Sequence, residues 1–159
     1  MLLTGVRRGE TFGLKWSDIT PDYIIICRSV TPQKEITTPK TVNSERLIPL
    51  TPMIKQILDE TPKRSKYVFN NDLLTLSASG VDLAFKRYCH YHNLTADRLH
   101  ELRHTFISLN LKTLTLTSVK TIVGHSANFD TVNTYGHLLP DDLKKSGKAI
   151  NDNFLNLIN

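Results

Sequence analysis

The chain has 159 residues, of which 40% are hydrophobic, a length and composition that fit one folded domain with a core of its own. It contains no apolar run long enough to span a bilayer and no signal peptide, so we expect a cytoplasmic protein without a membrane partner. Lys and Arg outnumber Asp and Glu by 20 to 15, and this basic balance favours a polyanionic partner.

The strands are expected in the first third of the chain. Thr4–Trp16 has apolar residues spaced among charges, which suits a short helix. Asp18–Val30 contains a run of β-branched residues bounded by prolines and is typical of a strand. Thr37–Leu50 predicts two further short strands around a turn at Asn43 and Ser44. We therefore predict a small antiparallel sheet of about three strands near the N-terminus.

From residue 51 onward the pattern is helical. Thr51 and Pro52 place a proline at a first helical position. The other predicted helices cover Ser77–His92, His100–Leu111, Val119–Val123, Phe129–Tyr135 and Asp141–Ile158. The last of these carries one apolar stripe, which we expect to pack within the chain rather than against a partner. The predicted fold class is α+β, a mainly helical domain with a small three-stranded antiparallel sheet.

Four blocks of sequence contain the residue types that cleavage of a phosphodiester requires. The reaction needs a nucleophile, cations that stabilise the negative charge on the non-bridging oxygens, and a proton donor for the leaving alkoxide. Arginine suits the second task because its planar fork binds two phosphate oxygens and keeps its charge. The blocks are Thr4-Gly5-Val6-Arg7-Arg8-Gly9-Glu10, Pro39–Leu50, His100-Glu101-Leu102-Arg103-His104, and Val123-Gly124-His125-Ser126 with Thr134-Tyr135-Gly136-His137 beyond it.

Taken together and in this order, the four blocks resemble the catalytic domain of the tyrosine recombinases, the phage integrase family. The resemblance implies that residues 1–159 form one catalytic domain. Members usually carry core-binding and arm-binding domains before the catalytic domain; we expect this sequence to be a fragment without them. It also implies site-specific DNA recombination or integration through a 3′-phosphotyrosine intermediate, as in the integrase of a phage or mobile element, without ATP, metal or another cofactor.

The resemblance gives a role to each matched position. The implied catalytic residues are Arg7, Lys40, His100, Arg103, His125 and Tyr135, with Glu10 in support. Tyr135 is the implied nucleophile, Lys40 protonates the leaving 5′ oxygen, and the two arginines clamp the phosphate. Glu10 is expected to orient active-site groups. His100 is our candidate for the base and His125 for a hydrogen bond to the phosphate, although the sequence leaves this division open.

The implied partner is double-stranded DNA, with self-association on it. The full-length enzyme would form a tetramer, for which the C-terminal helix is a candidate contact. Three alternatives stay open at this point. The chain could be a DNA-binding or assembly module without catalysis, or a type IB topoisomerase, which uses the same groups but religates the original strand. His100-Glu101-Leu102-Arg103-His104 also matches the HExxH zinc motif, a weak signal because so short a motif recurs by chance.

Arg46 is expected to cap or border a strand. Cys27 and Cys89 have no CxxC spacing, so two buried thiols are favoured over a disulfide or a metal site. Residues 110–118 lack the glycine turn that many members of the family have here, so the helix before them cannot end in a left-handed glycine cap.

Overall fold

The computed structural model describes residues 1–33, 35–37, 45–69, 78–96, 98–124 and 140–158. Three predicted site residues, Lys40, His125 and Tyr135, lie outside these ranges, as do the predicted turn at Asn43 and Ser44 and the predicted helix at 129–135. The described elements are α1 (Arg8–Gly13), η1 (Trp16–Asp18), β1 (Tyr23–Ile26), β2 (Ser29–Val30), β3 (Ile36–Thr37), β4 (Arg46–Pro49), α2 (Pro52–Glu60), α3 (Ala78–Tyr91), α4 (Leu99–Asn110), α5 (Leu116–Val123) and α6 (Pro140–Ile158).

The strands of the described ranges form two antiparallel pairs. β1 pairs with β4, so that Tyr23 lies opposite Pro49, and β2 pairs with β3. A single three-stranded sheet is therefore not confirmed. The predicted run Asp18–Val30 is interrupted between β1 and β2. Arg28 lies in this interruption. Its side chain donates hydrogen bonds to the Asp18 carboxylate and to the carbonyl of Gly13.

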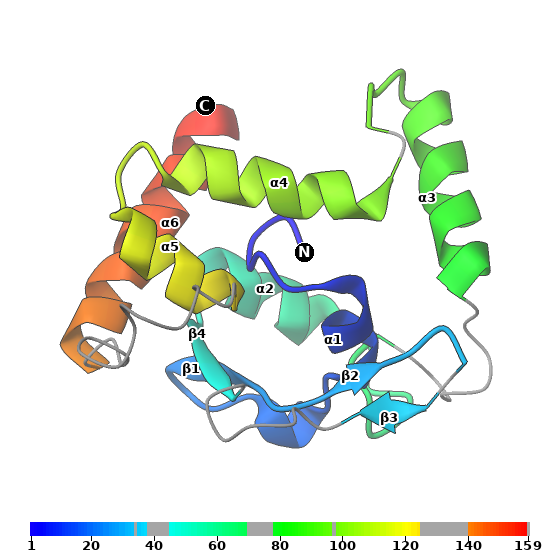
Figure 1. Cartoon of the computed structure of the whole chain (residues 1–159), viewed down its shortest axis with the longest axis horizontal. Coiled ribbons are helices and arrows are strands. Elements are labelled where there is room, and N and C mark those ends of the chain that lie inside the picture. The colour runs from blue at the N-terminus through cyan, green and yellow to red at the C-terminus, as the bar shows by residue number, and fades with distance from the viewer. Residues whose placement is uncertain (34, 38–44, 70–77, 97, 125–139, 159) are drawn as a thin grey trace, which may run out of the picture.

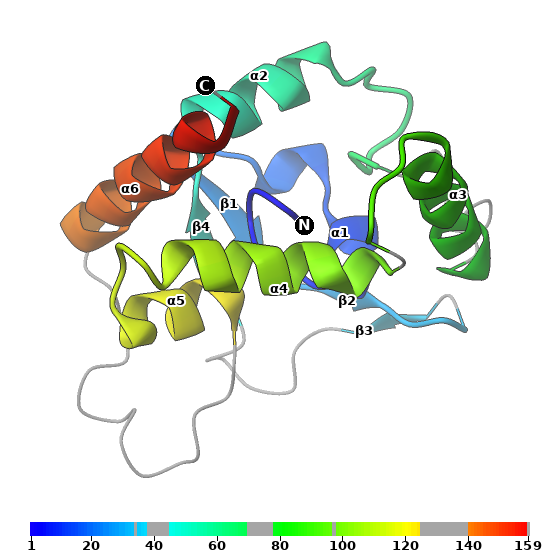
Figure 2. The same ribbon diagram turned by 90° about the horizontal axis from the view of Figure 1, so that it is seen from above.

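The strands gather along one side of the molecule, with α1 and α2 next to them (Figure 1). Figure 1 shows the strands along one side and α4, α5 and α6 across from them, with α3 at one end. In Figure 2 the first residues of the chain lie between α4 and the strands. Two apolar clusters follow from this arrangement, and Leu3 packs against both. The one under the helices is formed by Phe106, Val119, Ile122, Val123, Ile150 and Phe154.

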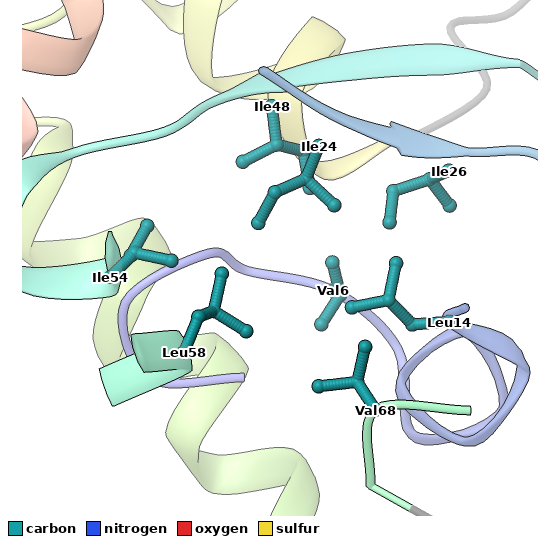
Figure 3. Close-up of a cluster of buried hydrophobic side chains, with 8 residues drawn as sticks. All are labelled: Val6, Leu14, Ile24, Ile26, Ile48, Ile54, Leu58 and Val68. Atoms are coloured by element: carbon teal, nitrogen blue, oxygen red, sulfur yellow. The ribbon is translucent and has the colours of Figure 1, made fainter. Parts of the chain in front are cut away.

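The second cluster lies between the β1–β4 pair and α2. Alternate residues of β1 are buried, as expected for a strand with one face on the core. Figure 3 shows Ile24 and Ile48 directed toward the side chains of α2 and of the N-terminal segment. The full set is Val6, Leu14, Ile24, Ile26, Ile48, Ile54, Leu58 and Val68. This cluster fixes β4 and the segment before α1 against each other.

Two helices begin where a threonine caps them. The Thr51 hydroxyl accepts a hydrogen bond from the backbone N–H of Ile54 at 3.3 Å, and Pro52 is the first helical residue, as predicted. α5 begins at Leu116, three residues before the predicted start, because the Thr115 hydroxyl accepts from the N–H of Ser118. The predicted helix at Thr4–Trp16 is shorter in the structure and is followed by the one-turn helix η1.

α4 ends without a glycine, as expected. Its cap residue Leu111 is right-handed, and the buried Asn110 side chain donates to the carbonyl of Phe106 at 2.8 Å. Asn153 of α6 donates to the Asn110 side-chain oxygen at 3.0 Å and to Thr113 at 2.7 Å. The turn between α4 and α5 is therefore held by asparagine hydrogen bonds to a neighbouring helix.

The apolar stripe of α6 packs only in part. Leu143, Ile150 and Phe154 are buried, in agreement with the prediction of packing within the chain. Leu155 is 38% exposed and Ile158 is 72% exposed, so the last turn leaves its apolar side chains in solvent. Of the helices that the structure describes, none is long and apolar enough to cross a membrane.

Both cysteines are free thiols. Cys89 is buried on α3, as predicted, whereas Cys27 is only partly buried beside Arg28.

Apart from Tyr135, which is outside the described ranges, the tyrosines of the chain lie in packing or surface positions. Tyr67 is 4% exposed in the core, whereas Tyr91 on α3 is 81% exposed.

Candidate functional site

The site begins with the first turn of α1. Arg7 is the cap residue before α1, and its backbone N–H donates to Glu10 Oε2 at 2.7 Å, the carboxylate half of a capping box. Arg7 Nη1 donates to Glu10 Oε1 at 3.3 Å. Its Nη2 reaches the carbonyl oxygen of Gly124 at 2.7 Å, at the end of α5. The side chain of Arg7 is 47% exposed, so its guanidinium is anchored yet open to solvent.

A second arginine holds the same carboxylate. Arg46, at the start of β4, donates from Nη1 to Glu10 Oε1 at 2.8 Å and from Nη2 to Glu10 Oε2 at 2.6 Å. Its Nε donates to the carbonyl of Ile122 at 2.8 Å. Burial raises the pKa of Glu10, but the hydrogen bonds and charge of Arg46 and the contacts from Arg7 outweigh it, so the pKa is lowered. Glu10 is thus an anion at neutral pH.

The close approach of Arg46 to α5 requires a glycine. Gly124 caps α5 in the left-handed conformation, with φ of +68°. A Cβ on Gly124 would lie 2.9 Å from Arg46 Nη1. Glycine therefore serves the helix end and the contact with the guanidinium at once.

The third arginine lies inside the molecule. Arg103 of α4 is 1% exposed and donates through Nη1 to the carbonyl of Gly5. Among the residues that the structure describes, its Nη2 has no hydrogen-bond partner. Burial, with the positive charge of Arg7 nearby, lowers the pKa of Arg103 to about 10, so it still carries its charge at neutral pH. A buried cation with an unused donor is a binding group for an anion.

His100 lies one turn before Arg103 on the same helix. Its side chain is exposed, and its ring lies edge-on to that of His104, with 4.8 Å between the centroids. Partial burial lowers the pKa of His100, and the positive charges of His104, Arg103 and Arg7 add to this effect. The imidazole is therefore neutral at pH 7 and able to accept a proton.

The structure brings four of the predicted residues together. Arg7 contacts Glu10 directly, and the charge of Arg7 acts on both Arg103 and His100. The placement of Lys40, His125 and Tyr135 is untested, since all three lie outside the described ranges. Within those ranges no group of three or more His, Cys, Asp or Glu side chains is placed to hold a metal ion.

The sequence does not predict the contacts that Arg46 makes with Glu10 and with α5. Arg46 lies at the border of a strand, as predicted, but its side chain faces Glu10 and α5 rather than solvent. One signal was available, because a charged residue opens the apolar run Arg46-Leu47-Ile48-Pro49. Its partners lie 36 and 76 positions away, so no local pattern identifies them.

Comparison with known proteins decides the family. The model of the phage integrase family matches residues 1–141. The chain belongs to the phage integrase family. This is the family that the four sequence blocks resemble, so the predicted resemblance is confirmed.

Two curated relatives are similar over nearly the whole chain. The ICEBs1 integrase of Bacillus subtilis (strain 168) is 28% identical over 94% of this chain and 46% of its own length. The XerC-like tyrosine recombinase of Caldanaerobacter subterraneus subsp. tengcongensis is 28% identical over 96% of this chain and 47% of its own length. The chain spans about half the length of these two integrase-family relatives.

Solved structures show the same fold. The Tn1549 transposon integrase in complex with circular intermediate DNA aligns with a TM-score of 0.66 and 24% identity, over 92% of this chain and 56% of that one. XerH recombinase in a post-cleavage complex with a difH substrate aligns with a TM-score of 0.59 and 20% identity, over 98% and 41%. These likenesses establish a mixed, mostly helical recombinase-type fold.

Proposed function

We propose that this chain is the strand-transfer part of a site-specific DNA recombinase, of the kind found in integrases of phages and mobile elements. The observation that carries the proposal is the buried Arg103, whose Nη2 has no partner among the described residues, together with a partly exposed Arg7 and a neutral His100. Membership of the phage integrase family supports it, and so do relatives named as an integrase and a recombinase.

The proposed reaction is a transesterification on a DNA strand. The Tyr135 hydroxyl attacks phosphorus, a bond from its oxygen to phosphorus forms, and the bond to the 5′ oxygen breaks. Lys40 gives a proton to that leaving oxygen. A free 5′-hydroxyl from a partner strand then reverses these steps on the 3′-phosphotyrosine. Because one phosphodiester is exchanged for another, the reaction needs no ATP.

The arginines would supply the charge stabilisation. Arg7 and Arg103 donate to the non-bridging oxygens, which gain negative charge as the phosphorus becomes five-coordinate. A metal ion is not needed for this task, because guanidinium groups provide the positive charge. His125 would add a hydrogen bond to the same oxygens.

His100 would act as the general base. An unperturbed tyrosine has a pKa of about 10, so a base is required to remove its proton at neutral pH. The lowered pKa of His100 keeps its imidazole free to accept that proton. Partial burial and cationic neighbours favour His100 for this role, because both lower its pKa.

A second part of the proposal concerns assembly. We assign the partner as double-stranded DNA and expect several copies to associate on it, with the exposed last turn of α6 as a contact. The lambda integrase structure is described as a tetramer bound to a Holliday junction. Leu157, at 62% exposure, and Ile158 are the apolar side chains available for such a contact. Light scattering tests it, because Leu157→Lys should reduce association on DNA while Leu83→Lys, on the exposed face of α3, should not.

Relaxation of supercoiled plasmid in EDTA, without ATP, tests the chemistry without knowledge of the target site. We expect relaxed topoisomers that Arg103→Gln abolishes. Binding of the plasmid without relaxation would favour the non-catalytic DNA-binding module, and activity only when zinc replaces EDTA would favour a zinc enzyme of the HExxH type. Exchange of strands between two labelled duplexes distinguishes a recombinase from a topoisomerase, which rejoins only the original strand.

A further inference from the structure

We propose that Arg46 is a positioning residue of the strand-transfer site, which holds Arg7 and the end of α5 in one fixed arrangement. The inference rests on the proposed function for its catalytic meaning, and on the contacts of Arg46 for its geometry. Arg46 opens β4, six residues after Lys40 in the sequence, and reaches both α1 and α5. It therefore connects β4, the start of α1 and the end of α5, and Lys40, Arg7 and His125 are near these in the sequence.

The guanidinium of Arg46 uses all three of its nitrogens. Nη1 and Nη2 each bind one oxygen of Glu10, at 2.8 and 2.6 Å, and Nε binds the carbonyl of Ile122 at 2.8 Å. Its side chain is 9% exposed, so water competes little for these bonds. The fork of an arginine makes this pattern, whereas the single ammonium of a lysine cannot reach three acceptors that lie on two elements.

Arg46 acts on Arg7 through a shared carboxylate. Glu10 Oε1 accepts from Arg46 at 2.8 Å and from Arg7 Nη1 at 3.3 Å, and Oε2 accepts from Arg46 at 2.6 Å and from the Arg7 backbone at 2.7 Å. The two bonds from Arg46 set the orientation of the carboxylate plane. That orientation in turn sets the direction of Arg7, whose own side chain is 47% exposed.

The remaining contacts close a ring. Arg7 Nη2 binds the carbonyl of Gly124 at 2.7 Å, and Gly124 lies two residues beyond Ile122, which Arg46 holds. The same Gly124 lies so close to Arg46 that a Cβ there would come within 2.9 Å of Nη1. The ring runs from Arg46 through Glu10, Arg7 and Gly124 back to Ile122. It aligns Arg7, the cap residue of α1, with the helix end that precedes His125 in the sequence.

Arg46→Gln and Arg46→Lys test this assignment, with Arg28→Lys as the matched control. Arg28 likewise binds a buried carboxylate, that of Asp18, and a backbone carbonyl, that of Gly13, but within the described ranges it forms no hydrogen bond or ion pair with the residues of the ring. Crystal structures give the distance from Arg7 Nη2 to the Gly124 carbonyl. A nicked duplex of defined sequence that the parent protein binds serves for two further measurements. One is the DNA affinity of each variant, and the other is its single-turnover rate of covalent adduct formation at saturating DNA.

We expect Arg46→Gln to separate Arg7 from Gly124 in the crystal. We expect both Arg46 variants to slow adduct formation by at least about tenfold, since misplacement of a reacting group by ~1 Å costs on the order of 100-fold. DNA affinity should stay within about threefold, and Arg28→Lys should lower the thermal midpoint without slowing the adduct step, because its carboxylate lies outside the ring.

Three results overturn the assignment: Arg7 keeping its contact with Gly124 in Arg46→Gln, a rate for Arg46→Lys within about twofold of the parent, or an equal loss of rate in Arg28→Lys. The crystallographic measurement does not depend on activity. If the parent forms no adduct while Arg7 moves in Arg46→Gln, the proposed function fails and the positioning of Arg7 by Arg46 stands.

Discussion

Both carboxylate oxygens of Glu10 accept hydrogen bonds from Arg46, one from Nη1 at 2.8 Å and one from Nη2 at 2.6 Å. The two side chains are 7% and 9% exposed, and they join α1 to β4 across 36 positions of sequence. A buried bidentate pair of this kind is geometrically specific because both partners are planar. It therefore ties the start of the candidate site to the strand that follows Lys40 in the chain.

Glu10→Gln should strongly destabilise the fold. The substitution leaves the charge of Arg46 buried without a counter-charge, and loss of one partner of a buried pair costs about 3–5 kcal/mol of the free energy of unfolding. Urea denaturation measures it. Asp59→Asn is the control, because the Lys55–Asp59 pair is more than 60% exposed and should contribute less than about 0.5 kcal/mol. Equal effects of the two substitutions would contradict a structural role for the Glu10 pair.

Arg103→Met should abolish catalysis with little loss of stability. The buried guanidinium of Arg103 is only partly satisfied, because its Nη2 has no partner among the described residues. Replacement by Met removes the cost of burying a charge, but it also leaves the carbonyl of Gly5 without its donor, which costs about 1–3 kcal/mol; these effects oppose each other, so the free energy of unfolding should change by less than about 2 kcal/mol. Thermal denaturation and plasmid relaxation measure the two effects. A large loss of stability would mean that Arg103 is kept for folding rather than for binding an anion.

Gly124→Ala should destabilise the chain by about 2 kcal/mol, because the left-handed conformation of a residue with a Cβ costs about 1–2 kcal/mol and the added methyl meets Arg46. A double-mutant cycle separates the two causes. In an Arg46→Ala background the contact is gone, so Gly124→Ala should cost less there. Identical costs in both backgrounds would show that only the backbone conformation matters at this position.

The rate of DNA cleavage should fall on the acid side with an inflection below pH 6.5, the ordinary pKa of histidine. The sign follows from the lowered pKa of His100: its neutral, proton-accepting form persists to lower pH than usual and is lost only as the pH falls through the lowered value. Rates at sub-saturating DNA report the free enzyme. His100→Gln should remove this acid limb, and His104→Gln should move it to higher pH by removing a nearby positive charge. A limb unchanged by His100→Gln would assign the base to another group.

Local patterns predict the helices well and the long-range contacts poorly. Thr51 and Pro52 begin α2 as predicted, because a cap and a proline act within one turn. The sequence predicts that α5 begins at Val119, three residues too late, because its cap Thr115 lies in a run that also suits a loop. The sequence does not predict the interruption of the run Asp18–Val30, because the contacts of Arg28 there form only in the folded chain.

The candidate site shows the same division. Arg7, Glu10, His100 and Arg103 were identified from motifs, and the structure brings them together. The ring through Arg46 was not, because its bonds span 36 and 76 positions and no single motif contains both ends. Motifs thus identify groups that are candidates for touching the substrate, whereas residues that act through others are found only in the structure.

Trapping the covalent intermediate tests directly whether Tyr135 is the nucleophile. A nicked duplex that releases a short fragment after cleavage holds the protein on DNA, and denaturing electrophoresis followed by mass spectrometry identifies the linked residue. We predict an adduct through Tyr135 in the parent chain and none in Tyr135→Phe, with DNA binding retained in the variant. An adduct that persists in Tyr135→Phe, or one linked through another residue, would show that Tyr135 is not the nucleophile.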